Sequence, residues 1–197
     1  SNILLKLIAL IGILLLTPFI LVVIIFVFME DGSPVLFIQK RLGKNEKEFS
    51  LIKIRTMFKN TPNLGTHEIG KDSFLNSGKF LRDLKIDELP QVSNFLLGHI
   101  DLVGPRPGLP NQKELLDFRR KNNVFAVKPG ITGLGQILSF DMSNPELLAK
   151  IDALYIANKS IKLDFKILLA TFFKSYRTKI YDYFREDIQS IKEAMNV

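Results

Sequence analysis

Residues 3–28 read ILLKLIALIGILLLTPFILVVIIFVF, and Lys6 is the only charged residue among them. As one continuous helix this stretch would be about 39 Å long, at about 1.5 Å per residue. That length exceeds the hydrocarbon core of a bilayer, which is roughly 30 Å thick. The segment is therefore predicted to enter a membrane. The remaining sequence, of mixed polarity, is long enough for one compact domain.

Thr17 and Pro18 stand near the middle of the apolar segment. Proline removes a backbone donor and clashes with the preceding turn, so a kink is expected there. Two topologies follow: a kinked spanning helix, which membranes tolerate, and a helix–break–helix that enters and leaves on one side. The residues alone favour the spanning helix. Both topologies place the following domain on the cytoplasmic side, because cations follow the segment closely: Lys40, Arg41, Lys44 and Lys47.

The composition narrows the class of protein. The 197 residues carry a formal net charge of +7, which suits anionic lipid headgroups, phosphorylated substrates or nucleic acid. A nucleic-acid binder is not expected, because the chain lacks a basic patch interleaved with aromatic residues. The absence of cysteine excludes disulfides and thiolate metal sites. With only His67 and His99, a histidine-based metal site is not expected either.

Residues 35–39 and 49–55 have the composition of two strands that form a small hairpin. In an extended strand Lys53 and Arg55 would share a face, about 7 Å apart. Two cations so placed suit a diphosphate, although a solvated strand face is the simpler interpretation and is favoured here. Residues 61–71 are predicted to form a loop that either is mobile or covers a substrate, and residues 74–85 a helix.

An acidic pair, Asp87 and Glu88, precedes Pro90 at the start of a further predicted helix that ends near residue 97. One interpretation is that Asp87 caps this helix. The other is that Asp87 is an ionised nucleophile able to attack phosphorus, while Glu88 beside it helps to hold magnesium (Mg²⁺). From the pair alone, capping is favoured.

Arg106 lies between Pro105 and Pro107, which restrict the backbone and lower the entropic cost of holding the guanidinium in one position. A phosphate contact and a structural role are equally supported. Lys128 and Gln136 flank a glycine-containing stretch that would let a phosphate or a base approach the backbone. These residues are candidates for substrate binding.

A helix is predicted to begin at residues 143–146 and to continue through residue 155. Residues 163–176 form a second, amphipathic pattern with lysines flanking an apolar face. This helix is expected either to lie in the membrane interface, in contact with phospholipids, or to pack on the core.

Taken together, these motifs resemble the monotopic phosphoglycosyl transferases, also called the bacterial sugar transferase family. The resemblance covers nearly the whole chain, and several uncommon motifs occur in the family's order. Besides the Pro-interrupted apolar segment they are Gln39-Lys40-Arg41-Leu42-Gly43, Lys53-Ile54-Arg55-Thr56-Met57, Leu81-Arg82, Asp87-Glu88-Leu89-Pro90-Gln91, Val103-Gly104-Pro105-Arg106-Pro107, Lys128-Pro129-Gly130-Ile131-Thr132-Gly133 and Leu163-Asp164-Phe165-Lys166-Ile167.

The resemblance implies an enzyme of α+β, helix-dominated fold at the bacterial inner membrane, with its catalytic domain on the cytoplasmic face. Residues 1–29 would form a re-entrant helix broken at Thr17 and Pro18, and residues 30–197 the catalytic domain with interfacial helices. The family transfers a sugar 1-phosphate from a UDP-sugar to a polyprenyl phosphate such as undecaprenyl phosphate. UMP is released, and the product starts a glycoconjugate such as an O-antigen, a capsule or a glycoprotein glycan.

The family's covalent nucleophile corresponds to Asp87, and Glu88 would assist it through Mg²⁺ or by handling a proton. Phosphate contacts are expected from Lys53, Arg82 and Arg106. The chain departs from the family pattern at Ile86, at residues 98–101 and at residues 135–140, where Gly135-Gln136 replaces a common Ala-Gln. Because residues after 136 are expected to border the nucleotide sugar, we expect a pocket for an N-acetylated 6-deoxyhexose. A non-catalytic membrane scaffold is the alternative, and it predicts that Asp87→Asn leaves function intact.

Overall fold

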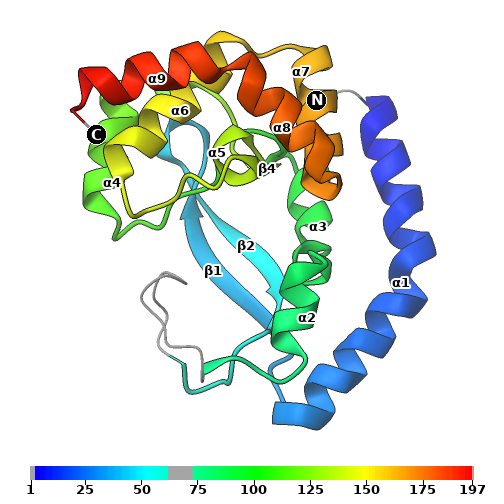
Figure 1. The fold of residues 1–197 in the computed structure, drawn as a ribbon. Helices are drawn as coiled ribbons and strands as arrows, with labels where there is room; N and C mark the ends of the chain where they lie inside the picture. Colours follow the sequence, from blue (N-terminus) through cyan, green and yellow to red (C-terminus); the bar gives the residue numbers. More distant parts are fainter. Residues whose placement is uncertain (1–2, 62–72, 197) are drawn as a thin grey trace. The chain divides into compact units, whose positions relative to one another are not determined.

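The computed structural model describes residues 3–61 and 73–196, so nearly all of the loop predicted at 61–71 lies outside the described residues. The chain forms two compact units. The first comprises residues up to 39 together with 50–98, and the second comprises residues 40–49 together with 99–197. Helices dominate both, alongside two small two-stranded sheets (Figure 1). The predicted α+β, helix-dominated class is confirmed.

The first unit begins with α1, Ile3–Asp31, which is long and apolar enough to cross a membrane. The predicted break is not present, because the helix continues through Pro18. The Thr17 hydroxyl donates to the carbonyl of Ile13 at 2.8 Å, a bond that commonly accompanies bent helices. Figure 1 shows that α1 changes direction along its length. The Thr-Pro step therefore bends the helix without interrupting it.

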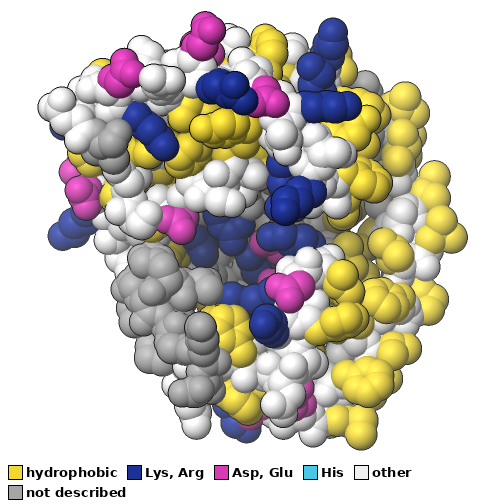
Figure 2. Space-filling model, in the orientation of Figure 1, with side chains coloured by type: hydrophobic (Ala, Val, Ile, Leu, Met, Phe, Trp, Pro, Cys, Tyr) yellow, Lys and Arg dark blue, Asp and Glu magenta, His cyan; other side chains and the backbone are white. Residues whose placement is uncertain are grey.

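The C-terminal half of α1 contributes to the core of the first unit. Val23 and Val27 are buried there, whereas most other apolar side chains of α1 are exposed. Their partners in this core are Ile54, Leu75, Leu81 and Ile86. Hydrophobic side chains accordingly cover the outward face of α1 (Figure 2).

The predicted hairpin is confirmed as β1, Leu36–Leu42, and β2, Glu48–Ile54, which pair in one sheet and are joined by the short 3₁₀ turn η1, Lys44–Glu46. The residues of both strands are divided between the two units. The two helices predicted next are shorter than expected. They are replaced by α2, Gly78–Asp83, the 3₁₀ turn η4, Ile86–Glu88, and α3, Gln91–Leu96.

In the second unit β3, Asp101–Val103, pairs in parallel with β4, Gly130–Thr132, a sheet that the sequence did not reveal. Glycines permit the close approach of these segments. A Cβ at Gly130 would lie 2.1 Å from the Gly104 nitrogen, and one at Gly133 would lie 2.1 Å from the Gly104 oxygen. Gly133 therefore serves backbone packing between these segments.

The remaining helices of this unit carry two apolar clusters, one that includes Tyr155, Ile167 and Phe184 and one that includes Leu115 and Leu148. They are α4, Lys113–Lys121, η5, Val124–Ala126, α5, Leu134–Ile137, α6, Pro145–Ala157, α7, Ile161–Phe172, α8, Lys174–Tyr183, and α9, Arg185–Ala194. The helix predicted from residues 143–146 is confirmed as α6, whose N-cap Asn144 accepts a hydrogen bond from the Leu147 amide at 2.9 Å.

The single amphipathic helix predicted at 163–176 is two helices. Phe173 separates α7 from α8 with extended backbone angles of φ −115° and ψ 115°. Leu163, Ile167 and Ala170 form the buried stripe of α7. Two aromatic residues of α7 lie outside this stripe, because Phe165 and Phe172 are 61% and 72% exposed. An apolar, exposed aromatic surface therefore remains on α7.

Candidate active site

The acidic pair lies in a short turn of the first unit. Lys85 adopts a left-handed conformation (φ 59°, ψ 19°), and the chain then passes directly into the 3₁₀ turn η4, which contains Asp87 and Glu88. Both carboxylates are buried, at 5% and 8% exposure. Neither η4 nor α3 has a side-chain cap. The capping interpretation of Asp87 is therefore wrong, because the turn is too short to be a helix start and its acidic side chains are buried.

Glu88 is held by a cation from β2. Its Oε1 atom lies 2.9 Å from Nζ of Lys53. The strand that carries Lys53 is fixed by Asn94 of α3, whose Oδ1 accepts from the Ile52 amide at 3.1 Å and whose Nδ2 donates to the Ser50 carbonyl at 2.7 Å. The fold thus places one lysine against the second carboxylate of the pair.

Asp87 is different, because its Oδ1 atom is buried and accepts no hydrogen bond from any described residue. Loss of hydration on burial raises the pKa of this carboxyl above its usual value of 3.8. The positive charge of Lys53 opposes that rise in pKa, the negative charge of Glu88 adds to it, and Arg82 and Lys85 oppose it more weakly. The result is a carboxylate close to cations, with one oxygen available to a reacting partner.

Arg82 belongs to the same neighbourhood. Its Nε donates to Oγ1 of Thr56 at 2.8 Å, and its guanidinium carbon lies 4.8 Å from the ring centre of Phe74. A hydrogen bond and an aromatic face together restrict this long side chain. The structure therefore gathers four predicted site residues in the first unit, namely Asp87, Glu88, Lys53 and Arg82.

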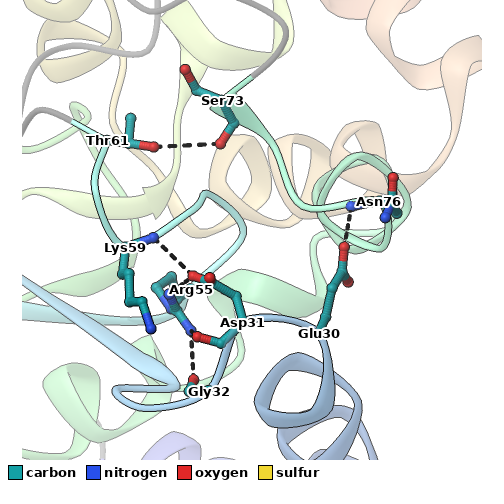
Figure 3. Close-up of polar contacts among 8 residues, drawn as sticks. All are labelled: Glu30, Asp31, Gly32, Arg55, Lys59, Thr61, Ser73 and Asn76. Carbon is teal, nitrogen blue, oxygen red and sulfur yellow. Dashed lines mark hydrogen bonds and ion pairs between the residues drawn. The ribbon is translucent and has the colours of Figure 1, made fainter.

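Arg55 does not join this group. It pairs with the carboxylate of Asp31 at the end of α1 and donates from Nη2 to the carbonyls of Asp31 and Gly32 at 3.2 and 2.6 Å (Figure 3). Strand β2 ends at Ile54, so the alternation of side chains that would place Arg55 beside Lys53 does not extend that far. The two cations bind different carboxylates, and Arg55 anchors the apolar helix.

The end of α1 is fastened at further points. The Lys59 amide donates to Asp31 Oδ2 at 2.9 Å. Glu30 accepts from the Asn76 amide and from the Ser77 hydroxyl, the latter at 2.7 Å (Figure 3 shows the Asn76 contact). These carboxylates were not singled out in the sequence, where they look like the polar border of a membrane segment.

The other predicted site residues lie in the second unit. Arg106 is exposed and Lys128 is half-buried. The side-chain amide of Gln136 donates to the Ile131 carbonyl at 3.3 Å, while its Oε1 atom is buried and accepts no hydrogen bond from the described residues.

Two buried residues of the second unit were missed. Arg119 and Asp152 form an ion pair of 2.6 Å with both side chains 3% exposed. In the sequence Arg119 is one of several cations in residues 113–121, and Asp152 is one polar residue within the helix predicted from residues 143–146. No local sequence signal links the two, because they are 33 residues apart.

The acidic pair suits a hard cation. Mg²⁺ prefers oxygen ligands and is commonly bound by one or two carboxylates that leave positions for water and phosphate. Asp87 and Glu88 supply such oxygens, and the unsatisfied Oδ1 of Asp87 fits a metal ligand as well as a nucleophile. Within residues 3–61 and 73–196 no cluster of three or more metal-binding side chains occurs, so a cation there would depend on substrate and water for its remaining ligands.

The chain is similar to known proteins over most of its length. Residues 2–178 match the family model described as "Bacterial sugar transferase". The chain is 40% identical over 152 residues to the sugar transferase EpsL of Bacillus subtilis, covering 77% of this chain and 75% of that protein.

Two longer relatives carry more specific names. One is the UDP-N-acetylgalactosamine-undecaprenyl-phosphate N-acetylgalactosaminephosphotransferase of Aeromonas hydrophila, 35% identical over 86% of this chain. The other is the UDP-glucose:undecaprenyl-phosphate glucose-1-phosphate transferase of Klebsiella pneumoniae, 34% identical over 84% of this chain. The matched region spans 41% and 38% of these two proteins, respectively.

Proposed function

The chain belongs to the bacterial sugar transferase family, and from that premise we propose that it transfers a sugar 1-phosphate from a UDP-sugar to undecaprenyl phosphate and releases UMP. The observation that carries the proposal is the buried Asp87, one of whose oxygens accepts no hydrogen bond within the described chain. The product, a polyprenyl diphosphate sugar, would begin assembly of a glycoconjugate such as an O-antigen, a capsule or a glycoprotein glycan.

The proposed reaction has two displacements at one phosphorus atom. In the first, an Asp87 oxygen forms a bond to the phosphorus that carries the sugar, and the bond from that phosphorus to the oxygen of UMP breaks. In the second, an oxygen of undecaprenyl phosphate attacks the same phosphorus, and the bond to Asp87 breaks. Splitting the transfer in this way is the usual benefit of a covalent intermediate. Burial of Asp87 removes water from the attacking oxygen, which is then surrounded by fixed protein groups in place of a hydration shell.

The cations have distinct proposed roles. Lys53 holds Glu88 at 2.9 Å and orders the acidic pair. Arg82, whose charge opposes the rise in the pKa of Asp87, would contact the phosphate that Asp87 attacks. Arg106, Lys128 and Gln136 are proposed to bind the rest of the nucleotide sugar.

Mg²⁺ would be held by Asp87 and Glu88 together with phosphate oxygens. When bound it would neutralise charge on the diphosphate and so favour departure of UMP. Glu88, fixed by Lys53, would keep its carboxylate oriented for that role.

We further propose that α1 is re-entrant, entering and leaving the bilayer on the cytoplasmic side. Near its start, Nζ of Lys6 donates to the Leu96 carbonyl at 2.6 Å, which is at the end of α3. At its other end, Asp31 pairs with Arg55. Because both ends of α1 contact the same unit, a topology that carries Lys6 to the opposite side of the membrane is disfavoured.

The exposed aromatic residues of α7 are proposed to contact phospholipids. Phe165 and Phe172 present apolar surface, and Lys162, Lys166 and Lys174 lie close to them in the sequence. Aromatic and lysine side chains together are typical of a helix at the membrane interface.

The sugar is proposed to be an N-acetylated 6-deoxyhexose, from the altered residues 135–140. The relatives' names include both N-acetylgalactosamine and glucose, so family membership by itself does not fix this choice. A panel of UDP-sugars that differ at C2 and C6 tests it directly.

The decisive experiment is intact mass spectrometry of purified, detergent-solubilised protein with Mg²⁺ and each UDP-sugar, without lipid acceptor. We expect UMP release and a phosphosugar adduct in the wild type and no adduct in Asp87→Asn. UMP release only after undecaprenyl phosphate is added, with no adduct, would replace the covalent route by direct transfer. No reaction under either condition would favour a non-catalytic scaffold.

A further inference from the structure

Residues 103–109 of the second unit form a buried stretch with one exception. Six of these seven residues are buried, whereas Arg106 is exposed. Val103 and Leu109, at the two ends, are 3% and 5% exposed. The stretch therefore presents a single guanidinium on an otherwise inaccessible segment of backbone.

The backbone of this stretch is held by hydrogen bonds from outside it. Because Pro105 and Pro107 lack N–H groups, the segment cannot form a regular ladder, and its buried carbonyls need other donors. Four consecutive carbonyls have them: Pro105 from the Gly130 amide at 3.0 Å, Arg106 from Nη1 of Arg119 at 2.8 Å, Pro107 from Nη1 of Arg41 at 2.9 Å and Gly108 from the Leu42 amide at 3.0 Å.

The donor to Arg106 is itself firmly fixed. Arg119 is 2% exposed, and its Nε and Nη2 atoms donate to Oδ2 of Asp152 at 3.0 and 2.6 Å. One planar guanidinium thus joins α4, α6 and the backbone of Arg106. Lysine could not make both contacts, because its single ammonium lacks the fork of donors.

A buried ion pair is a costly way to stabilise a fold, since apolar residues of similar volume often serve as well. The pair here does something that apolar residues could not do, because it supplies a hydrogen-bond donor to the backbone carbonyl of the exposed arginine itself. Its geometry is therefore better explained by the position of Arg106 than by stability alone.

We infer that Arg119, oriented by Asp152, is a positioning residue that holds Arg106 for contact with a substrate phosphate. This inference rests on the proposed function, which identifies that phosphate as part of a nucleoside diphosphate. Apart from Asp152, Arg119 binds the backbone carbonyl of Arg106, so its effect on the substrate phosphate is expected to pass through Arg106.

A double-mutant cycle tests this inference with the UDP-sugar that the wild type uses best. Arg119→Lys is expected to lower kcat/KM about tenfold in the wild-type background. In the R106A background the same substitution is expected to lower it less than about twofold, because the effects of two mutations are not additive when one residue acts through the other. Arg120→Lys is the matched control, since Arg120 is the next residue, lies on the surface and pairs with Glu46 and Asp117. It is expected to leave kcat/KM unchanged.

Hydrogen exchange provides a readout that does not depend on turnover. The peptide covering residues 103–112 is expected to exchange faster in Arg119→Lys than in the wild type or in Arg120→Lys. If Arg119→Lys does not fold, Arg41→Lys removes the neighbouring bond to Pro107 and should give the same pattern at smaller amplitude.

Unchanged exchange in residues 103–112, or equal losses of kcat/KM in both backgrounds, would overturn the inference. If the wild type releases UMP from no UDP-sugar, the proposed function fails. The inference that Arg119 positions Arg106 is then tested by the same double-mutant cycle with the Kd of UDP as the measured quantity. Additive effects of the two mutations on this Kd, or an absence of UDP binding, would overturn it.

Discussion

Asp87 of the first unit and Asp152 of the second are both buried aspartates, at 5% and 3% exposure. Burial raises the pKa of each carboxyl. Their partners differ. Asp152 accepts two hydrogen bonds from one guanidinium, whereas Oδ1 of Asp87 accepts none from the described residues. Burial is thus opposed by the hydrogen bonds and the charge of one guanidinium at Asp152, and by the charges of nearby cations alone at Asp87.

This difference separates a structural carboxylate from a reactive one. A buried polar atom without a partner lowers stability, so its presence in a folded protein needs an explanation. At Asp87 the explanation is an oxygen reserved for substrate or metal. At Asp152 no such reserve exists, because Arg119 occupies the carboxylate from the adjacent helix.

The largest expected effect is that of Asp87→Asn on turnover. Without a carboxylate that can attack phosphorus, UMP release should fall by about a thousandfold or more, as for other nucleophile replacements. The same substitution should raise the free energy of unfolding by roughly 1 kcal/mol at pH 7, because a buried, poorly paired charge is removed. Thermal unfolding in detergent and a UMP-release assay measure the two effects.

The pH dependence of stability tests whether the buried charge of Asp87 is the reason for the gain in stability expected for Asp87→Asn. Because the pKa of Asp87 is raised in the folded state, its ionisation lowers stability increasingly as the pH rises above the ordinary value of 3.8. The stability advantage of Asp87→Asn should therefore shrink as the pH falls toward 3.8. An advantage that stays constant over this range, or a loss of stability at pH 7, would contradict our view of Asp87.

Much of this architecture could be predicted from local signals. The hairpin follows from strand-forming runs on either side of a polar turn, and α6 from the Asn-Pro-Glu start at residues 144–146. The long apolar helix α1 follows from its length and its lack of charge. The acidic pair and the Pro-flanked arginine could be singled out because their residue types are unusual in sequence.

The partners of those residues could not be predicted, since they are set by tertiary packing. Arg55 appeared to face the same way as Lys53, yet β2 ends one residue earlier and Arg55 binds Asp31. Asp87 appeared to be a helix cap, yet the left-handed Lys85 leads into a turn that buries it. The pairing of Arg119 with Asp152 joins residues from two helices, which no sequence period encodes.

The next largest effect is expected from Asp152→Asn, and it concerns stability. This change leaves the guanidinium of Arg119 buried without a counter-ion, which typically costs about 3–5 kcal/mol. We expect a marked fall in Tm, in contrast to the gain expected for Asp87→Asn. Thermal unfolding of the two variants under the same conditions measures this contrast. If Asp152→Asn leaves Tm unchanged, the proposed distinction between a structural Asp152 and a reactive Asp87 is wrong.

A smaller effect is expected from Lys53→Met on the pH dependence of turnover. Lys53 lies 2.9 Å from Glu88 and opposes the rise in the pKa of Asp87, so its loss should raise that pKa further. The acidic limb of the pH–rate profile should move to higher pH. Lys53→Arg, which keeps the charge, should retain the wild-type profile. An unmoved limb in Lys53→Met would show that Lys53 does not set the ionisation of the pair.

The smallest effect is expected from Glu46→Gln, which tests whether burial or distance distinguishes the ion pairs of the second unit. Arg120 lies 2.6 Å from Glu46, the same distance that separates Arg119 from Asp152, but the side chains of the first pair are 48% and 35% exposed. Exposed pairs contribute little because water and salt screen them. The hydrogen bond from the Arg120 guanidinium lowers the pKa of Glu46 below its usual value of 4.5. Any contribution of this ion pair to stability is therefore present above pH 4.5 and is lost as the pH falls through the lowered pKa.

We therefore expect Glu46→Gln to leave Tm almost unchanged at pH 7, with any small loss disappearing at high salt or in acid. A fall in Tm comparable to that of Asp152→Asn would mean that ion-pair distance matters more than burial. The contrast between Asp152 and Asp87 would then have to be explained by distance to a partner alone. An unchanged Tm instead assigns the structural role of Asp152 to its burial together with its partner, and leaves Asp87 as the buried carboxylate whose oxygen is kept for chemistry.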